Sequence, residues 1–206
     1  MTVTRWVLLL FLLPMWLVAP LFGTVHWLSG LAVLAALALC IWSNRRSGAG
    51  WGFRGEALLP ALAWAAALTL PVVALTLLLG RGLGTLRADD HLVPRFLILV
   101  GWALVQQFIL QTAVLREMRI VCGPRAAPAV AAGLFALLHF PNPFLTPVTF
   151  LAGLGWCRLY DRHPNLVPIA LSHACSSLVA VLAFGPAITG GMRVGYGYFL
   201  HHGVWM

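Results

Sequence analysis

Residues 94–115 read PRFLILVGWALVQQFILQTAVL, and this stretch decides the class of fold. Apart from Arg95 near its start it carries no charge, and it has the roughly 20 residues that an apolar helix needs to cross a bilayer. Amide side chains nevertheless stand in its second half, at Gln106, Gln107 and Gln111. Because polar groups inside a membrane are costly, they usually face a bundle interior or a wet cavity. The stretch therefore predicts a membrane-spanning helix whose polar face is turned toward other helices.

The whole chain has the composition of an integral membrane protein. Of its 206 residues, 61% are hydrophobic and 9% are charged, whereas about a quarter of the residues in a soluble domain are charged. The net charge is +8, and every basic residue is an arginine that lies between or at the ends of apolar segments. We expect these arginines to set topology and contact anionic head groups rather than nucleic acid. The four cysteines form no CxxC pair and are expected to be small core residues: Cys40, Cys122, Cys157 and Cys175.

Further apolar runs predict an all-α polytopic bundle of about seven to eight helices, forming one domain over residues 1–206. The predicted spans are 6–22, 25–42, 57–79, 94–115, 127–140, 144–160 and 166–184. The first is interpreted as a retained span, because it is long for a signal-peptide core and lacks a small-residue cleavage site. The aromatic and glycine-rich tail, 194–206, is either an interfacial segment or a short eighth element.

The distribution of arginines predicts that the N-terminus is cytoplasmic. With that orientation the cytoplasmic segments hold nine arginines and the opposite segments hold four. Cytoplasmic loops of membrane proteins carry the excess of basic residues. Seven spans would then place the tail on the outer side.

Three pairs of residues four apart share a helix face in three different spans: Gln107 with Gln111, Phe135 with His139, and His173 with Ser177. Each has a purely structural interpretation. Glutamines can link helices by hydrogen bonds, and small residues such as Ser172, Ser176 and Ser177 allow helices to approach closely. The two histidines are harder to explain in that way, because a buried imidazole must place both of its nitrogens.

In order and spacing, these clusters resemble the CPBP family of intramembrane proteases, which includes the CAAX prenyl endopeptidases and bacterial abortive-infection and bacteriocin-immunity proteins. That family carries Glu-Glu-x-x-x-Arg, Phe-x-x-x-His and His-x-x-x-Asn on successive helices. Here FALLH matches the second motif at Phe135 and His139, and His173 matches the histidine of the third. The stretch TFLAGLGWCRLYDRHPNLVPIALSHACSS, residues 149–177, resembles the family's connection between them. The resemblance covers about residues 100–180.

The first and third motifs are altered. Gln106 and Gln107 stand where the family has glutamates, Gln111 where it has arginine, and Ser177 where it has asparagine. The resemblance gives Gln106 the place of the residue that activates water. A carboxylate there can accept the proton of water, whereas an amide cannot act as a base in that pH range. Glu117 is no substitute, because eleven residues of helix separate it from Gln106 by about 16 Å.

The resemblance implies a CAAX-type intramembrane endopeptidase, a hydrolase of membrane-associated or prenylated peptides in a bacterial inner membrane. It implies four catalytic residues and three substrate-binding or supporting ones: Gln106, Gln107, His139 and His173, then Gln111, Phe135 and Ser177. No metal or cofactor is expected, and the expected partners are membrane lipid and a membrane-anchored peptide or protein. Because the glutamates are missing, the alternative is a pseudoprotease that binds such partners without cutting them.

Three other hypotheses stay open at this point. One histidine can itself be the base while the other stabilises an oxyanion. A metal held by His139 and His173 with His201 or His202 is less favoured, since no carboxylate lies nearby to orient the ligands. A transporter or channel would need a continuous polar path, whereas the polar clusters lie on a limited set of helices.

Overall fold

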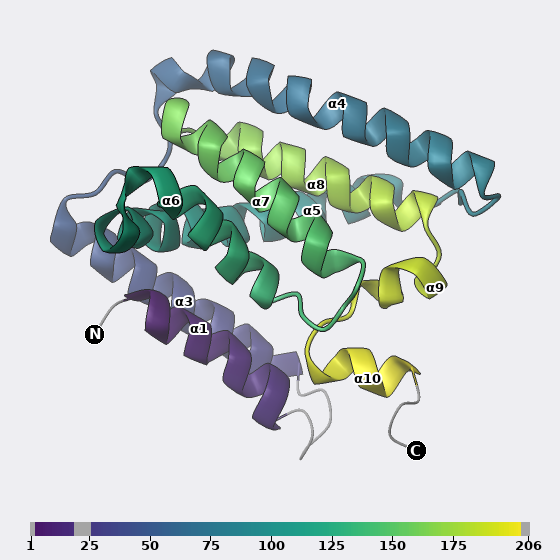
Figure 1. Cartoon of the computed structure of the whole chain (residues 1–206), viewed down its shortest axis with the longest axis horizontal. Coiled ribbons are helices and arrows are strands. Elements are labelled where there is room, and N and C mark those ends of the chain that lie inside the picture. The colour runs from purple at the N-terminus through teal and green to yellow at the C-terminus, as the bar shows by residue number, and fades with distance from the viewer. Residues whose placement is uncertain (1–2, 19–25, 203–206) are drawn as a thin grey trace.

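The computed structural model describes residues 3–18 and 26–202, and this part of the chain is built of helices without a strand (Figure 1). The helices are α1 Val3–Leu13, α3 His26–Ser47, α4 Leu58–Gly82, α5 Leu92–Phe108, α6 Arg116–Leu137, α7 Leu145–Arg162, α8 Leu166–Ala183, α9 Pro186–Thr189 and α10 Tyr196–His202. Four helical stretches are long and apolar enough to cross a membrane: Trp27–Ser47, Gly55–Gly82, Leu92–Leu137 and Leu166–Ala183. The predicted all-α membrane bundle is confirmed.

Most of the predicted spans match helices to within a few residues. Helices α4, α7 and α8 correspond to the spans predicted at 57–79, 144–160 and 166–184. The first predicted span is α1 followed by a π-helical turn, Pro14–Val18, and its last residues lie outside the described part of the chain. In the tail, α10 has seven residues, and its length of about 10 Å is a third of the hydrocarbon thickness.

The fourth predicted span does not end at residue 115. Helix α5 continues through a π-helical segment, Ile109–Leu115, into α6, and helical geometry is first interrupted at Gly123, where φ is 81° and ψ is 164°. The charged residues Arg116, Glu117 and Arg119 follow directly after the predicted end. Charged residues end the part of a helix that lies in hydrocarbon, but they do not end the helix itself.

The fifth predicted span, 127–140, ends slightly earlier, at Leu137, and His139 follows in a turn. Pro141 accounts for this end, because the residue before a proline is disfavoured in the α conformation. The next helix, α7, is started by Asn142, whose Oδ1 accepts hydrogen bonds from the backbone nitrogens of Phe144 and Leu145 at 3.0 and 2.9 Å. Asn142 is fully buried.

The helices pack in pairs that Figure 1 shows plainly. Helix α8 lies between α4 and α5 and contacts both, α6 contacts α7, and α1 contacts α3. Polar side chains join the first of these pairs, because the hydroxyls of Thr69 in α4 and Ser172 in α8 are 2.6 Å apart. Near the end of α4 the helices come closer still. A Cβ added to Gly80 would lie 2.7 Å from the backbone oxygen of Ala183.

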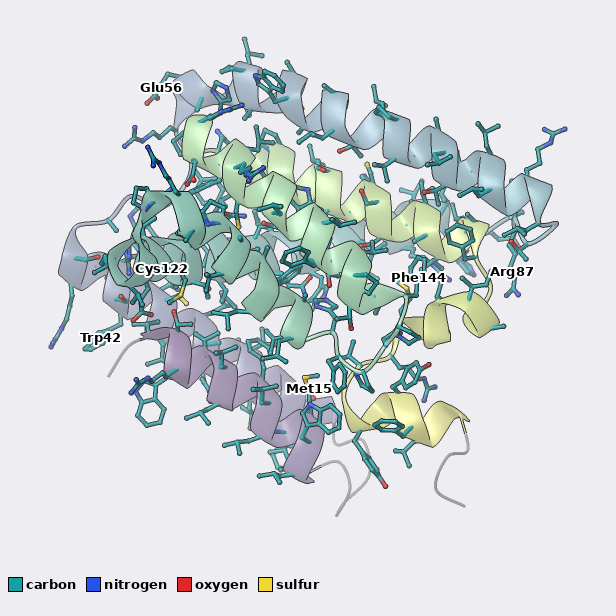
Figure 2. The ribbon with its side chains drawn as sticks, viewed as in Figure 1. Met15, Trp42, Glu56, Arg87, Cys122 and Phe144 are labelled. Atoms are coloured by element: carbon teal, nitrogen blue, oxygen red, sulfur yellow. The ribbon has the colours of Figure 1, made fainter. Side chains whose placement is uncertain are left out.

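Arginine-bearing segments gather at one end of the bundle. Figure 2 shows Trp42, Glu56 and Cys122 at this end and Arg87 and Phe144 toward the other. Polar contacts join these segments. Arg116 donates a hydrogen bond to Asn44 Oδ1 at 2.5 Å, and Glu117 accepts one from the backbone nitrogen of Thr4 at 2.7 Å. Arg119 forms an ion pair with Asp161. Two of the five carboxylates are thus engaged in holding this end together.

The approach of α4 to α8 gives a test of the packing. Replacing Gly80 with alanine forces a methyl group against the Ala183 backbone, and we expect a loss of about 1–3 kcal/mol in unfolding free energy. The control is Gly82→Ala, since a Cβ at Gly82 meets nothing within 4 Å. Thermal unfolding in detergent micelles measures both. Equal melting temperatures for the two variants would contradict the close contact.

Candidate active site

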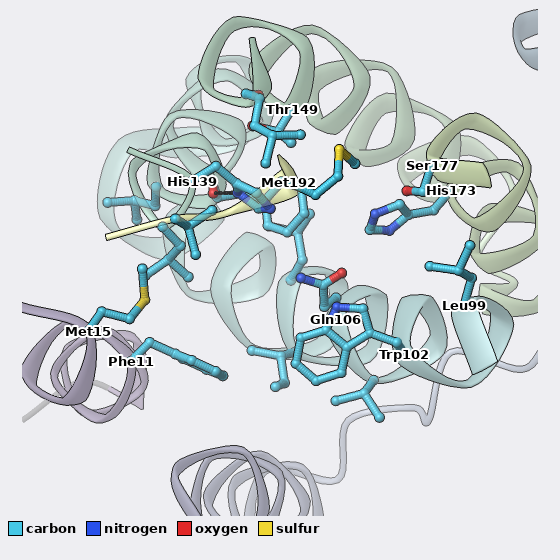
Figure 3. Close-up of a pocket in the computed structure, with 18 of the residues that line it drawn as sticks. Phe11, Met15, Leu99, Trp102, Gln106, His139, Thr149, His173, Ser177 and Met192 are labelled. Carbon is cyan, nitrogen blue, oxygen red and sulfur yellow. Dashed lines mark hydrogen bonds between the residues drawn. The ribbon is translucent and has the colours of Figure 1, made fainter. Parts of the chain in front are cut away.

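A cavity of about 590 Å³ lies among α1, α5, α6, α7 and α8 and the segment after α9. Most of its wall is apolar, including Phe11 and Trp102. The polar side chains in the wall are Arg95, Gln106, His139, Thr149, His173 and Ser177. Figure 3 shows Gln106, His139, His173 and Ser177 around one space. Concave, mostly apolar pockets with a few convergent polar groups are the usual form of a ligand site.

His139 is oriented by the backbone of the helix that precedes it. Its Nδ1 lies 2.8 Å from the carbonyl oxygen of Phe135, one turn earlier. A carbonyl oxygen only accepts hydrogen bonds, so Nδ1 carries the proton. In the neutral ring Nε2 is then left with its lone pair, and His139 presents an acceptor to the cavity.

His173 is oriented by a side chain of α5. Its Nδ1 lies 3.2 Å from Gln107 Nε2. An amide nitrogen only donates hydrogen bonds, so Nδ1 of His173 accepts and Nε2 carries the proton. His173 therefore presents a donor to the cavity, the opposite of His139.

The direction of this hydrogen bond depends on how the two amides behind His173 are turned. Gln111 Nε2 donates to Gln107 Oε1 at 2.9 Å, and in the described structure Gln111 Oε1 has no hydrogen-bond partner. Turning both amides over would preserve the chain of bonds but leave an NH₂ group unpaired instead. Buried orphan donors are rarer than under-satisfied carbonyl oxygens, so the orientation with Gln107 donating to His173 is favoured.

Aromatic rings fix the position of both imidazoles. Phe135 meets the His139 ring edge-on at a centroid distance of 4.8 Å and the His173 ring at 6.0 Å. The Trp156 indole stacks on His173 at 4.5 Å. The indole Nε1 donates a hydrogen bond to the Ser172 hydroxyl at 3.0 Å. The same hydroxyl is hydrogen-bonded to the hydroxyl of Thr69. His173 is thus held by side chains of α5, α6 and α7, and its neighbour Ser172 links α8 to α4.

The predicted site residues therefore divide into two groups. Gln106 and Ser177 face the cavity with the two histidines, and among the described residues their side chains form no hydrogen bond. Gln107 and Gln111 are buried behind His173, with exposures of 0% and 1%. Phe135 packs between the rings. Their catalytic and supporting roles remain predictions. Five of the seven residues line one cavity, and Gln107 and Gln111 lie behind it.

Sequence reasoning missed Trp156, Ser172 as a hydrogen-bonding hub, and Met192, which also lines the cavity. A tryptophan or methionine in an apolar chain gives no signal of its own. Ser172 could have been found only from its place beside His173, since its partners lie on other helices.

Comparison with known proteins bears on the family of the chain. Residues 88–179 match the family model described as type II CAAX prenyl endopeptidase Rce1-like. This stretch, 92 of the 206 residues, is similar to that family. The prediction from the sequence motifs is confirmed. No curated protein and no solved structure matches the chain.

In the described part of the chain the cavity wall contains no carboxylate. All five acidic residues lie in the described part of the chain, and none of them lines the cavity. One carboxylate, Asp89, contacts a residue of the cavity wall, because it forms an ion pair with Arg95 at 2.7 Å. Among the described side chains no three metal-binding groups cluster, while the side chains of His201 and His202 lie outside the described residues.

The cavity still combines a proton acceptor with hydrogen-bond donors. The lone pair on His139 Nε2 can accept the proton of a water molecule. The N–H of His173 Nε2 can donate to an oxygen on which negative charge develops, which is where a fixed donor contributes most. The Gln106 amide offers a further donor. The arrangement therefore pairs a proton acceptor with hydrogen-bond donors in a wall that holds no carboxylate.

The opposite tautomers can be measured directly. In protein labelled with ¹⁵N-histidine, we expect His139 to be protonated at Nδ1 and His173 at Nε2, which nitrogen chemical shifts distinguish. Replacing Gln107 with leucine removes the donor to His173 Nδ1, so the His173 signals should change while those of His139 stay. Identical tautomers for the two rings would contradict the assignment.

Proposed function

We propose that this Rce1-like protein holds a membrane-anchored peptide in the cavity and hydrolyses one of its peptide bonds, with His139 as the base. The observation that carries the proposal is the pairing of an acceptor on His139 with a donor on His173 in one cavity. The apolar wall suits a hydrophobic or prenylated peptide segment. Water and the scissile carbonyl would lie between the two rings.

The reaction follows from the tautomers. His139 Nε2 takes a proton from water as the water oxygen bonds to the carbonyl carbon. The carbonyl oxygen gains negative charge and accepts hydrogen bonds from His173 Nε2 and the Gln106 amide. The protonated His139 then donates its proton to the departing amine as the C–N bond breaks. Gln107 positions His173, because its hydrogen bond fixes the ring nitrogen that faces the cavity.

A second function is favoured by a specific observation, the absence of a carboxylate from the cavity wall. On this view the protein is a pseudoprotease that binds the same membrane-anchored partners and leaves them intact. The two functions share a ligand and a pocket, and they differ only in the fate of the peptide bond.

Cleavage assays with the reconstituted protein separate the two functions. Vesicles carrying the protein receive a quenched fluorescent peptide with a membrane anchor. General acid–base groups contribute about 10²–10⁴-fold to rate, so His139→Ala and His173→Ala should each reduce cleavage by at least about 100-fold. His91→Ala is the matched control, since His91 is exposed and does not line the cavity; its rate should equal that of the wild type.

The variant Gln106→Glu tests whether an inactive wild type lacks only a carboxylate base or lacks a working substrate pocket. If the wild type is inert and Gln106→Glu cuts the peptide, the scaffold is competent and the native protein is a pseudoprotease. Wild-type cleavage that survives in both histidine variants would contradict the proposed mechanism. Photocrosslinking of the same anchored peptide reports binding in every variant, whether or not the peptide is cut.

A further inference from the structure

The segment between α9 and α10 holds a methionine in a backbone conformation that its side chain does not favour. Met192 has φ of 57°, and it follows Gly190 and Gly191 with φ of 60° and 61°. Glycine adopts this left-handed region freely, whereas a residue with a Cβ does so at a cost. In the described part of the chain Met192 is the single non-glycine residue with a positive φ.

Neighbouring residues maintain this conformation. The buried side chain of Asn142 donates from Nδ2 to the carbonyl oxygens of Thr189 and Arg193 at 2.8 and 2.9 Å, one on each side of Met192. On one flank Gly190 packs so closely that an added Cβ would lie 2.6 Å from the Tyr198 ring. On the other, a Cβ on Gly195 would lie 2.9 Å from Met15. The segment is fixed from both sides.

The consequence of this backbone is the direction of the Met192 side chain. It lines the same cavity as the two histidines. Figure 3 shows it extending across the cavity between His139 on one side and His173 with Ser177 on the other. A methionine that merely filled a gap in the core would need no left-handed backbone. Strained backbone that is held by its surroundings tends to occur at ligand clamps and active sites.

We infer that Met192 determines which substrates fit, by occupying the space beside the reacting bond that a substrate side chain would otherwise fill. The inference rests on the proposed binding of a membrane-anchored peptide and adds its specificity. With Met192 in place, the substrate residue next to the scissile bond is small, such as alanine or glycine. The unbranched thioether side chain can adapt its shape but still occupies the volume.

Two anchored peptides test this inference. They differ only in the residue next to the scissile bond, which is alanine in one and phenylalanine in the other. A pocket discriminates by roughly 10–200-fold for even one methylene group, so the wild type should prefer the alanine peptide at least about tenfold. Met192→Gly should raise the phenylalanine-to-alanine ratio about tenfold. Met192→Leu, which keeps the volume, should retain the wild-type ratio.

The control variant is Arg193→Ala, because the Arg193 side chain is exposed and the contact to Asn142 uses its backbone oxygen. Binding by photocrosslinking and cleavage are both measured. The melting temperature of Met192→Gly should not fall, since glycine accepts the left-handed conformation.

The outcomes distinguish a failure of the role assigned to Met192 from a failure of the proposed peptide binding and cleavage. Peptides that bind or are cut with an unchanged ratio in Met192→Gly overturn the role of Met192 and leave the proposed function standing. A lower melting temperature together with an unchanged ratio identifies Met192 as core packing, which also overturns it. If neither peptide binds to any variant, the proposed function fails and the inference falls with it.

Discussion

The hydrogen bond from Gln107 to His173 joins α5 to α8 through two buried side chains. In a bilayer a polar group without a partner is costly, so this bond constrains more than two residues. It fixes which nitrogen of His173 faces the cavity, and Gln111 fixes Gln107 in turn. The stacking of Trp156 on the same ring adds α7 to the assembly. The shape of the cavity and the packing of the bundle therefore depend on one polar contact.

The uncharged character of this polar core is consistent with where the carboxylates are placed. Glu117 binds the start of α1, Asp161 pairs with Arg119, and Asp89 pairs with Arg95. Burying a neutral amide costs less than burying a charge. Gln107 and Gln111, the amides buried behind His173, therefore cost less to bury than carboxylates at the same positions would. What remains is a site whose polar groups hydrogen-bond without carrying a formal charge, apart from Arg95 in the cavity wall.

Much of this architecture could be predicted from the sequence, because helix length and apolar composition decide what crosses a membrane. The positions of α4, α7 and α8 follow in this way, and the motif spacing brought His139 and His173 to one cavity. The continuation of the helix past Arg116 could not be predicted, since hydropathy locates the membrane and not the end of a helix. Trp156 and Met192 were also missed. Their importance arises from contacts between distant parts of the chain, and nothing in their local sequence distinguishes them from other apolar residues.

The π-helical segment Ile109–Leu115 lies between the two polar regions of one long helix. A π-turn contains an extra residue relative to an α-turn. A π-helix therefore turns through a smaller angle per residue than an α-helix, and the extra residue is absorbed within this segment instead of rotating the helix that follows. On the two sides of it, Gln107 meets His173 and Arg116 meets Asn44. The segment therefore sets the phase between the polar core and the arginine-rich end of the protein.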